Sequence, residues 1–150
     1  MEKEIRNRDP NRYFLEGMYK NVKISSERTV SVLPKVGNRG MISDMTASLM
    51  ELSDAARVLE VMMHERGIEP SPPGFLSKIG AAAGMGLGTL MDRSEKNIAR
   101  LCTASSENSI KRLSTMCEDV GKLCDGEMTR LCTDIMEKER KNCERMEAYL

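Results

Sequence analysis

The chain has 150 residues, with 23 Lys+Arg and 23 Asp+Glu, so its formal net charge is zero. This length suits one domain with a real core, and the neutral balance argues against nucleic acid as the main partner, because phosphate binding needs a basic face. Aromatic residues make up 3% of the chain and Trp is absent, which also disfavours base-stacking surfaces. Thirteen Met residues indicate a soft, adaptable interior.

The beginning of the chain predicts a charged tail over residues 1–8, followed by a single domain over 9–150. The tail has no apolar run of the kind found in signal peptides, and no stretch approaches the ~18 apolar residues of a membrane span. We therefore expect a cytoplasmic protein whose five cysteines are reduced. These cysteines are Cys102, Cys117, Cys124, Cys132 and Cys143.

Helical periodicity and helix-end signals predict four long helices and no strand. The first, over about 9–33, begins at Asp9-Pro10 and stops before Pro34. The second, over about 41–66, ends at Gly67. The third begins near Asp92, which forms a capping box with Glu95, and runs to about residue 119. After a turn near 121–126, the fourth helix runs to the end of the chain.

A Pro-rich linker over 69–74 and a short helix over 75–91 lie between the second and third long helices. This order predicts an all-α, ferritin-like four-helix bundle with a long crossover that carries a short extra helix.

Several packing and turn motifs agree with this fold: Tyr19-Lys20-Asn21-Val22-Lys23, Leu33-Pro34-Lys35-Val36, Lys78-Ile79-Gly80-Ala81 and Glu147-Ala148-Tyr149-Leu150. In these motifs the chain resembles a family of small, uncharacterised bacterial ferritin-like proteins of the clostridial type. The resemblance covers most of the chain after the tail. It implies the four-helix fold and no established reaction.

A ferritin-like metal centre needs two glutamates and two Glu-x-x-His pairs at the middle of the four helices, and this chain has one histidine, His64. The predicted helix midpoints carry Ser, Thr and Ala instead: Ser25, Ser26, Thr29, Ala55, Ala56, Ser105 and Ser109. Only Glu139 is placed inward, with Asn142 where a histidine would stand. We therefore expect the metal centre to be absent or degenerate. Glu139 is then predicted to bond to Asn142 and to serines of the facing helices, in a polar layer that fixes register. The alternative is that Glu139 is the remnant of a metal ligand.

Glu60 and His64 lie one helical turn apart at the rim of the bundle face and predict an exposed ion pair. The alternative is a non-standard iron or manganese site formed by Glu60, His64 and Glu139. The helical phase places Glu27 and Glu51 toward water.

The cysteines form no Cys-x-x-Cys pair, so we interpret them as structural, with a redox role for Cys117 and Cys124 as the alternative. Gly80, Gly84 and Gly88 leave a strip of bare backbone on the short helix. This strip predicts close packing, a dimer contact, or a partner or membrane surface.

Taken together, these patterns predict a cytosolic, non-enzymatic protein that acts through interaction or assembly, either as a homo-oligomer or with a protein partner, and the family resemblance implies a bacterial one. We expect no catalytic residues, cofactor or membrane span. The alternative hypothesis is a ferritin-like metal-binding or redox protein.

Overall fold

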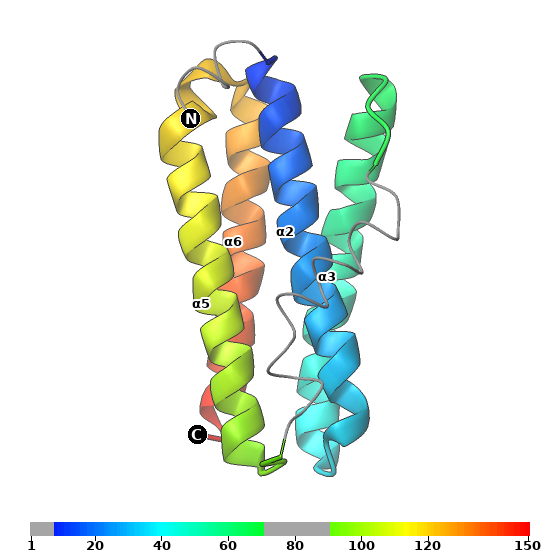
Figure 1. Cartoon of the computed structure of the whole chain (residues 1–150), viewed down its shortest axis with the longest axis vertical. Coiled ribbons are helices and arrows are strands. Elements are labelled where there is room, and N and C mark those ends of the chain that lie inside the picture. The colour runs from blue at the N-terminus through cyan, green and yellow to red at the C-terminus, as the bar shows by residue number, and fades with distance from the viewer. Residues whose placement is uncertain (1–7, 71–90) are drawn as a thin grey trace.

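A computed structural model describes residues 8–70 and 91–150, and this part of the chain is all-α, with four long helices and no strand (Figure 1). The long helices are α2 (Pro10–Val32), α3 (Arg39–Glu65), α5 (Glu95–Val120) and α6 (Gly126–Glu147). Two short 3-10 turns, η1 (Leu33–Lys35) and η2 (Gly121–Leu123), follow α2 and α5. The four predicted long helices are thus confirmed.

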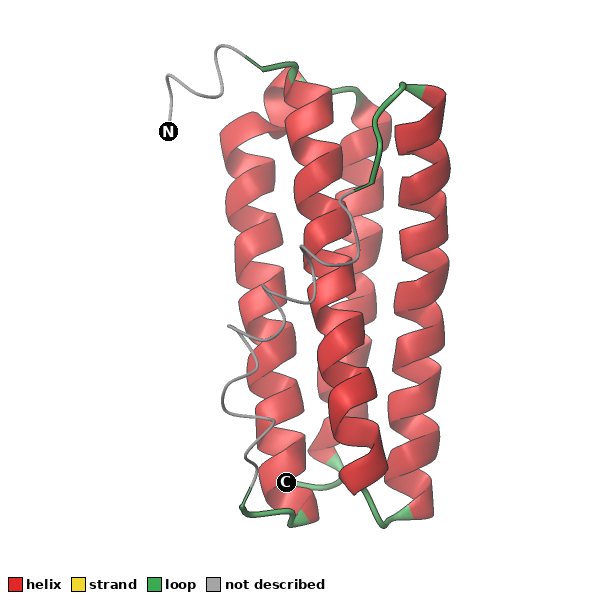
Figure 2. Cartoon of the chain, turned by 45° about the vertical axis from the view of Figure 1, so that its right-hand side comes forward, coloured by secondary structure: helices red, strands yellow, loops and turns green. Residues whose placement is uncertain are grey.

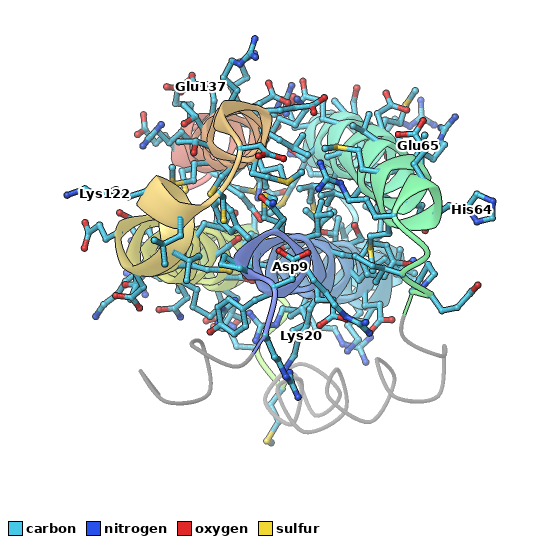
Figure 3. The ribbon with its side chains drawn as sticks, turned by 90° about the horizontal axis from the view of Figure 1, so that it is seen from above. Asp9, Lys20, His64, Glu65, Lys122 and Glu137 are labelled. Atoms are coloured by element: carbon cyan, nitrogen blue, oxygen red, sulfur yellow. The ribbon has the colours of Figure 1, made fainter. Side chains whose placement is uncertain are left out.

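The helices pack as a square bundle in which α2 and α6 each contact both α3 and α5 (Figure 3). In Figures 1 and 2, α2 and α6 run in one direction and α3 and α5 in the other. The end of α3 and the beginning of α5 therefore lie at opposite ends of the bundle, as the predicted long crossover requires. The extra helix predicted over 75–91 lies outside the described residues except for Met91, which is not helical.

Polar side chains set the beginnings of the helices. Asp9 caps α2 by accepting the N–H of Asn11. Asn38 caps α3 by accepting the N–H of Met41, so this helix begins at Arg39, two residues earlier than predicted.

The beginning of α5 differs from the predicted capping box. Ser94 is the N-cap, and its hydroxyl accepts the N–H of Asn97. Asp92 instead accepts the N–H of Ser94 and lies outside the helix. The predicted cap was wrong by two residues because Asp92 and Ser94 are both favourable N-cap residues.

The end of α3 follows the predicted glycine cap. Gly67 has φ +66°, the left-handed conformation that glycine adopts readily. The N–H of Ile68 then bonds to the carbonyl of Met63 at 2.8 Å, and the Ile68 side chain is buried.

Two apolar clusters form the core. The larger one gathers buried side chains including Leu15, Leu59 and Ile135, and the smaller one gathers Met41 and Met146. Buried polar residues occupy the level between them on all four long helices, with Ser48 as the contribution of α3. The core is thus interrupted midway along the bundle, and the candidate site lies there.

Candidate functional site: a buried polar layer around Glu139

Glu139 is 1% exposed and points into the bundle from the middle of α6, as predicted. Its carboxylate accepts three hydroxyl hydrogen bonds from the two helices that face it. Ser25 of α2 and Ser109 of α5 donate to Oε1 at 2.6 and 2.8 Å, and Ser106 of α5 donates to Oε2 at 2.8 Å. The predicted bonding of Glu139 to serines of the facing helices is confirmed.

Two buried amides complete the network. Asn142 donates to the hydroxyl of Ser106 at 2.7 Å, and Asn21 donates to the hydroxyl of Ser109. A serine hydroxyl has a single hydrogen, and Ser106 and Ser109 both donate theirs to Glu139. Toward the amides of Asn142 and Asn21, the same hydroxyls therefore act as acceptors. The sequence had predicted a bond between Asn142 and Glu139. In the structure Asn142 bonds to Ser106 instead. We call this set the polar layer: Asn21, Ser25, Ser106, Ser109, Glu139 and Asn142.

Two arginines lie beside the polar layer. Arg112 donates from Nε to Asn21 at 3.1 Å, and Arg28 donates to Ser105 at 2.8 Å. Burial, and next the neighbouring Arg28, lower the pKa of Arg112, whereas Glu139 raises it in opposition. Arg112 is thus linked to the Glu139 carboxylate through the neutral side chains of Asn21 and Ser109, and within the described residues Glu139 makes no direct ion pair.

A small cavity borders the polar layer. Its volume is about 20 Å³, which is the space that one water molecule needs. Glu139, Asn142, Ser105 and Arg28 contribute polar atoms to its wall. The Nε atom of Arg28 is buried and has no hydrogen-bond partner within the described part of the protein. The cavity is therefore suited to a single small polar molecule and is too small for an organic substrate.

The remaining predicted ligands lie away from Glu139. The hydroxyl of Tyr19 donates to Glu60 at 2.9 Å, so Glu60 turns toward α2 and not toward His64. His64 is exposed and points away from the bundle in Figure 3. Burial, and next Glu60, raise the pKa of Tyr19 to about 12.

The structure does not bring Glu60, His64 and Glu139 together. Tyr19 contacts Glu60 and Ser25 contacts Glu139, and these two residues of α2 are separated by about 9 Å of helix rise. Within residues 8–70 and 91–150, no group of three or more His, Cys, Asp or Glu side chains is arranged to hold a metal ion.

Two members of the polar layer were not predicted from the sequence, and two carboxylates are less exposed than predicted. Ser106 and Asn21 are buried, whereas Ser105, predicted to face inward, is half-buried and bonds to Arg28. Glu27 and Glu51 were predicted to face water, and both are half-buried.

The partner of Glu51 explains its position. Arg145 of α6 makes two hydrogen bonds to the Glu51 carboxylate, each 3.0 Å long. The helical phase of α3 alone could not reveal this contact, because the partner lies on another helix.

All five cysteines are free thiols. Burial raises the pKa of Cys102 to about 11, and burial together with Cys117 raises that of Cys132 to about 12. The pKa of Cys124 is also raised, by burial first and then by Asp125. A raised pKa reduces the thiolate fraction at neutral pH, and the thiolate is the reactive form. These environments are typical of structural cysteines.

Apolar side chains are exposed on the side of α3 that faces away from the bundle. Met50 is 64% exposed, Val61 57% and Val58 49%. The glycine strip of Gly80, Gly84 and Gly88, predicted as a contact surface, lies outside the described residues. The exposed side of α3 is therefore the clearest candidate contact surface in the described part of the chain. None of the described helices combines the length and apolar character that crossing a membrane requires.

Comparison with known proteins supports the fold only. No family model matches the sequence, and no curated protein matches it. Among solved structures, the chain is similar to the crystal structure of a DUF305 fragment from Deinococcus radiodurans, with a TM-score of 0.70 and 20% sequence identity. The match covers 94% of this chain and 95% of that chain. It is consistent with an all-helical bundle.

Proposed function

We propose that this chain is a non-enzymatic, ferritin-like bundle protein that acts through interaction or assembly, and that its core carboxylate has a structural role. The observation that carries the proposal is the bonding of Glu139. Both of its oxygens accept hydrogen bonds from serines, and two of these serines are in turn held by Asn21 and Asn142. A carboxylate engaged in this way favours a fixed register of the helices over ligand binding.

The interaction role is supported by the exposed apolar side chains of α3. Val58 and Val61 lie one helical turn apart and are both about half exposed, and neighbouring exposed apolar side chains of this kind can form a contact surface. The five free thiols are typical of a reducing compartment, so we propose the cytoplasm as the location. The resemblance to clostridial-type ferritin-like proteins belongs to the same proposal and would account for the long crossover.

The metal content of the protein tests this function. Elemental analysis of protein purified without chelator is expected to find less than stoichiometric iron, manganese and zinc. The alternative, a metal-binding or redox protein that uses Glu60, His64 and Glu139, predicts one metal ion or more per chain. In that case His64→Ala would lower the metal content, and the proposed structural role of Glu139 would be refuted.

A further inference from the structure

Six residues of α3 form one continuous face that points away from the bundle. They are separated by alternating steps of three and four residues, which is the spacing of a helix–helix contact seam. We call this set the outer face of α3: Ala47, Met50, Asp54, Arg57, Val61 and His64. None of the six is buried, and His64 points outward in Figure 3.

The outer face has apolar residues near its ends and a charged centre. Met50 and Val61 are 64% and 57% exposed. Between them, Asp54 and Arg57 form an ion pair 3.0 Å long, with side chains 67% and 75% exposed. Such an exposed pair contributes little to the stability of a single chain.

The outer face of α3 is complementary to the same face of a second copy that runs in the opposite direction. If a second copy of α3 lies antiparallel, with the two-fold axis midway between residues 55 and 56, then Met50 faces Val61 of the other copy. In the same register Asp54 faces Arg57, and Ala47 faces His64. A single two-fold axis therefore brings both the apolar residues and the opposite charges of the two copies face to face.

We propose that the outer face of α3 is a two-fold symmetric interface with a second copy of this chain. A two-fold interface uses the same surface on both copies and needs this kind of self-complementarity. The inference rests on the proposed interaction role and names its partner. At the centre, each Asp54 would lie between its own Arg57 and that of the other copy, and the two Met–Val contacts would cover the charged centre from either side.

Exchange of charge across the interface provides the test. Asp54→Arg places two arginines on each copy, and Arg57→Asp places two aspartates, so each variant repels itself. We expect either change to weaken self-association by tenfold or more, as measured by sedimentation equilibrium over a range of concentrations. The double variant Asp54→Arg/Arg57→Asp restores every facing pair, both within one chain and between copies, and is expected to associate like the wild type.

Mixing the two single variants gives the most specific result. A chain with two arginines complements a chain with two aspartates, so an equimolar mixture is expected to form a heterodimer although neither variant forms a dimer alone.

Glu137→Arg on α6 is the matched control, because Glu137 is exposed on another helix and its reversal is expected to leave association unchanged (Figure 3). Circular dichroism and thermal unfolding verify that each variant is folded. Met50→Ser with Val61→Ser gives a second route to a monomer if a charge variant does not fold.

The dimer is contradicted if the wild type remains monomeric at every concentration, or if the mixed variants remain monomeric while the wild type associates. A monomeric, metal-free wild type would refute the dimer and leave the proposed function standing. A stoichiometric metal ion would refute the proposed function whatever the oligomeric state.

Discussion

Glu139 shows how one buried charge can be accommodated without an ion pair. An isolated carboxylate in an apolar interior is very costly, and three hydroxyl donors reduce this cost by replacing the hydrogen bonds of water. A hydrogen bond to a charged group contributes about 1.5–3 kcal/mol. The serines come from two different helices, so the carboxylate links both α2 and α5 to α6.

The sequence predicted Glu139 correctly and its serine partners only in part. In the last helix, Ile135 and Met146 fix the helical phase, and Glu139 lies on the same face. In the third helix, residues 103–106 are Thr, Ala, Ser and Ser, none of which is strongly apolar. The phase there was uncertain by one residue, and Ser105 was predicted in place of Ser106.

Tyr19 offers a test of a single contact. Its pKa is raised from 10.0 to about 12, first by burial and then by Glu60. Because the folded pKa is the higher one, the neutral phenol contributes stability that is complete below about pH 10 and is lost as the pH rises toward 12.

Glu60→Gln is expected to lower the pKa of Tyr19, but not to 10, because burial remains. A titration of phenolate absorbance, with Tyr13 and Tyr149 changed to Phe, measures this value. Glu65→Gln is the control at an exposed position of the same helix. An unchanged pKa in Glu60→Gln would show that Glu60 does not influence the phenol.

At the scale of elements, contacts between helices decide what the periodicity of one helix cannot. Glu51 was assigned to the water-facing side of α3, yet it lies beside α6, whose Arg145 holds it with two hydrogen bonds. The same applies to Glu60, which meets Tyr19 of α2. In both cases the contact depends on which helices are neighbours.

The Glu51–Arg145 pair is expected to stabilise the α3–α6 contact in a pH-dependent manner. The Arg145 hydrogen bonds lower the pKa of Glu51 below 4.5, although burial opposes this shift. A lowered folded pKa means that the contribution is present above about pH 4.5 and is lost as the pH falls through the folded pKa.

Glu51→Gln is therefore expected to cost about 0.5–1 kcal/mol at neutral pH and much less at a pH below the folded pKa of Glu51, as measured by urea unfolding. Glu137→Gln is a matched control, because Glu137 also pairs with an arginine, Arg140, but within one helix and with both side chains about half exposed. An equal cost for Glu51→Gln at both pH values would contradict the ion-pair account.

At the scale of the whole molecule, the four long helices of residues 8–70 and 91–150 and their order followed from the sequence, as did a crossover between opposite ends of the bundle. Long amphipathic segments, the Asp9-Pro10 start and the Gly67 cap determine these features locally. The pairing of the helices and the composition of the polar layer depend on packing between segments distant in sequence. The similar fold of the DUF305 fragment at 20% identity indicates that this architecture tolerates extensive sequence change.

We propose that Glu139 is a structural hydrogen-bond acceptor and not a metal ligand. Glu139→Gln keeps the size of the side chain but turns one acceptor into a donor that faces a serine hydroxyl, and we expect it to cost about 2–3 kcal/mol. The free energy of unfolding of wild type and variant should be measured with a chelator and again with excess Mn²⁺. If the folded protein binds the metal, a free Mn²⁺ concentration of about 100 times the dissociation constant would stabilise it by about 2.7 kcal/mol. A structural role predicts that the free energies of unfolding of wild type and Glu139→Gln differ by the same amount with chelator and with Mn²⁺. Stabilisation of the wild type alone by Mn²⁺ would contradict this role.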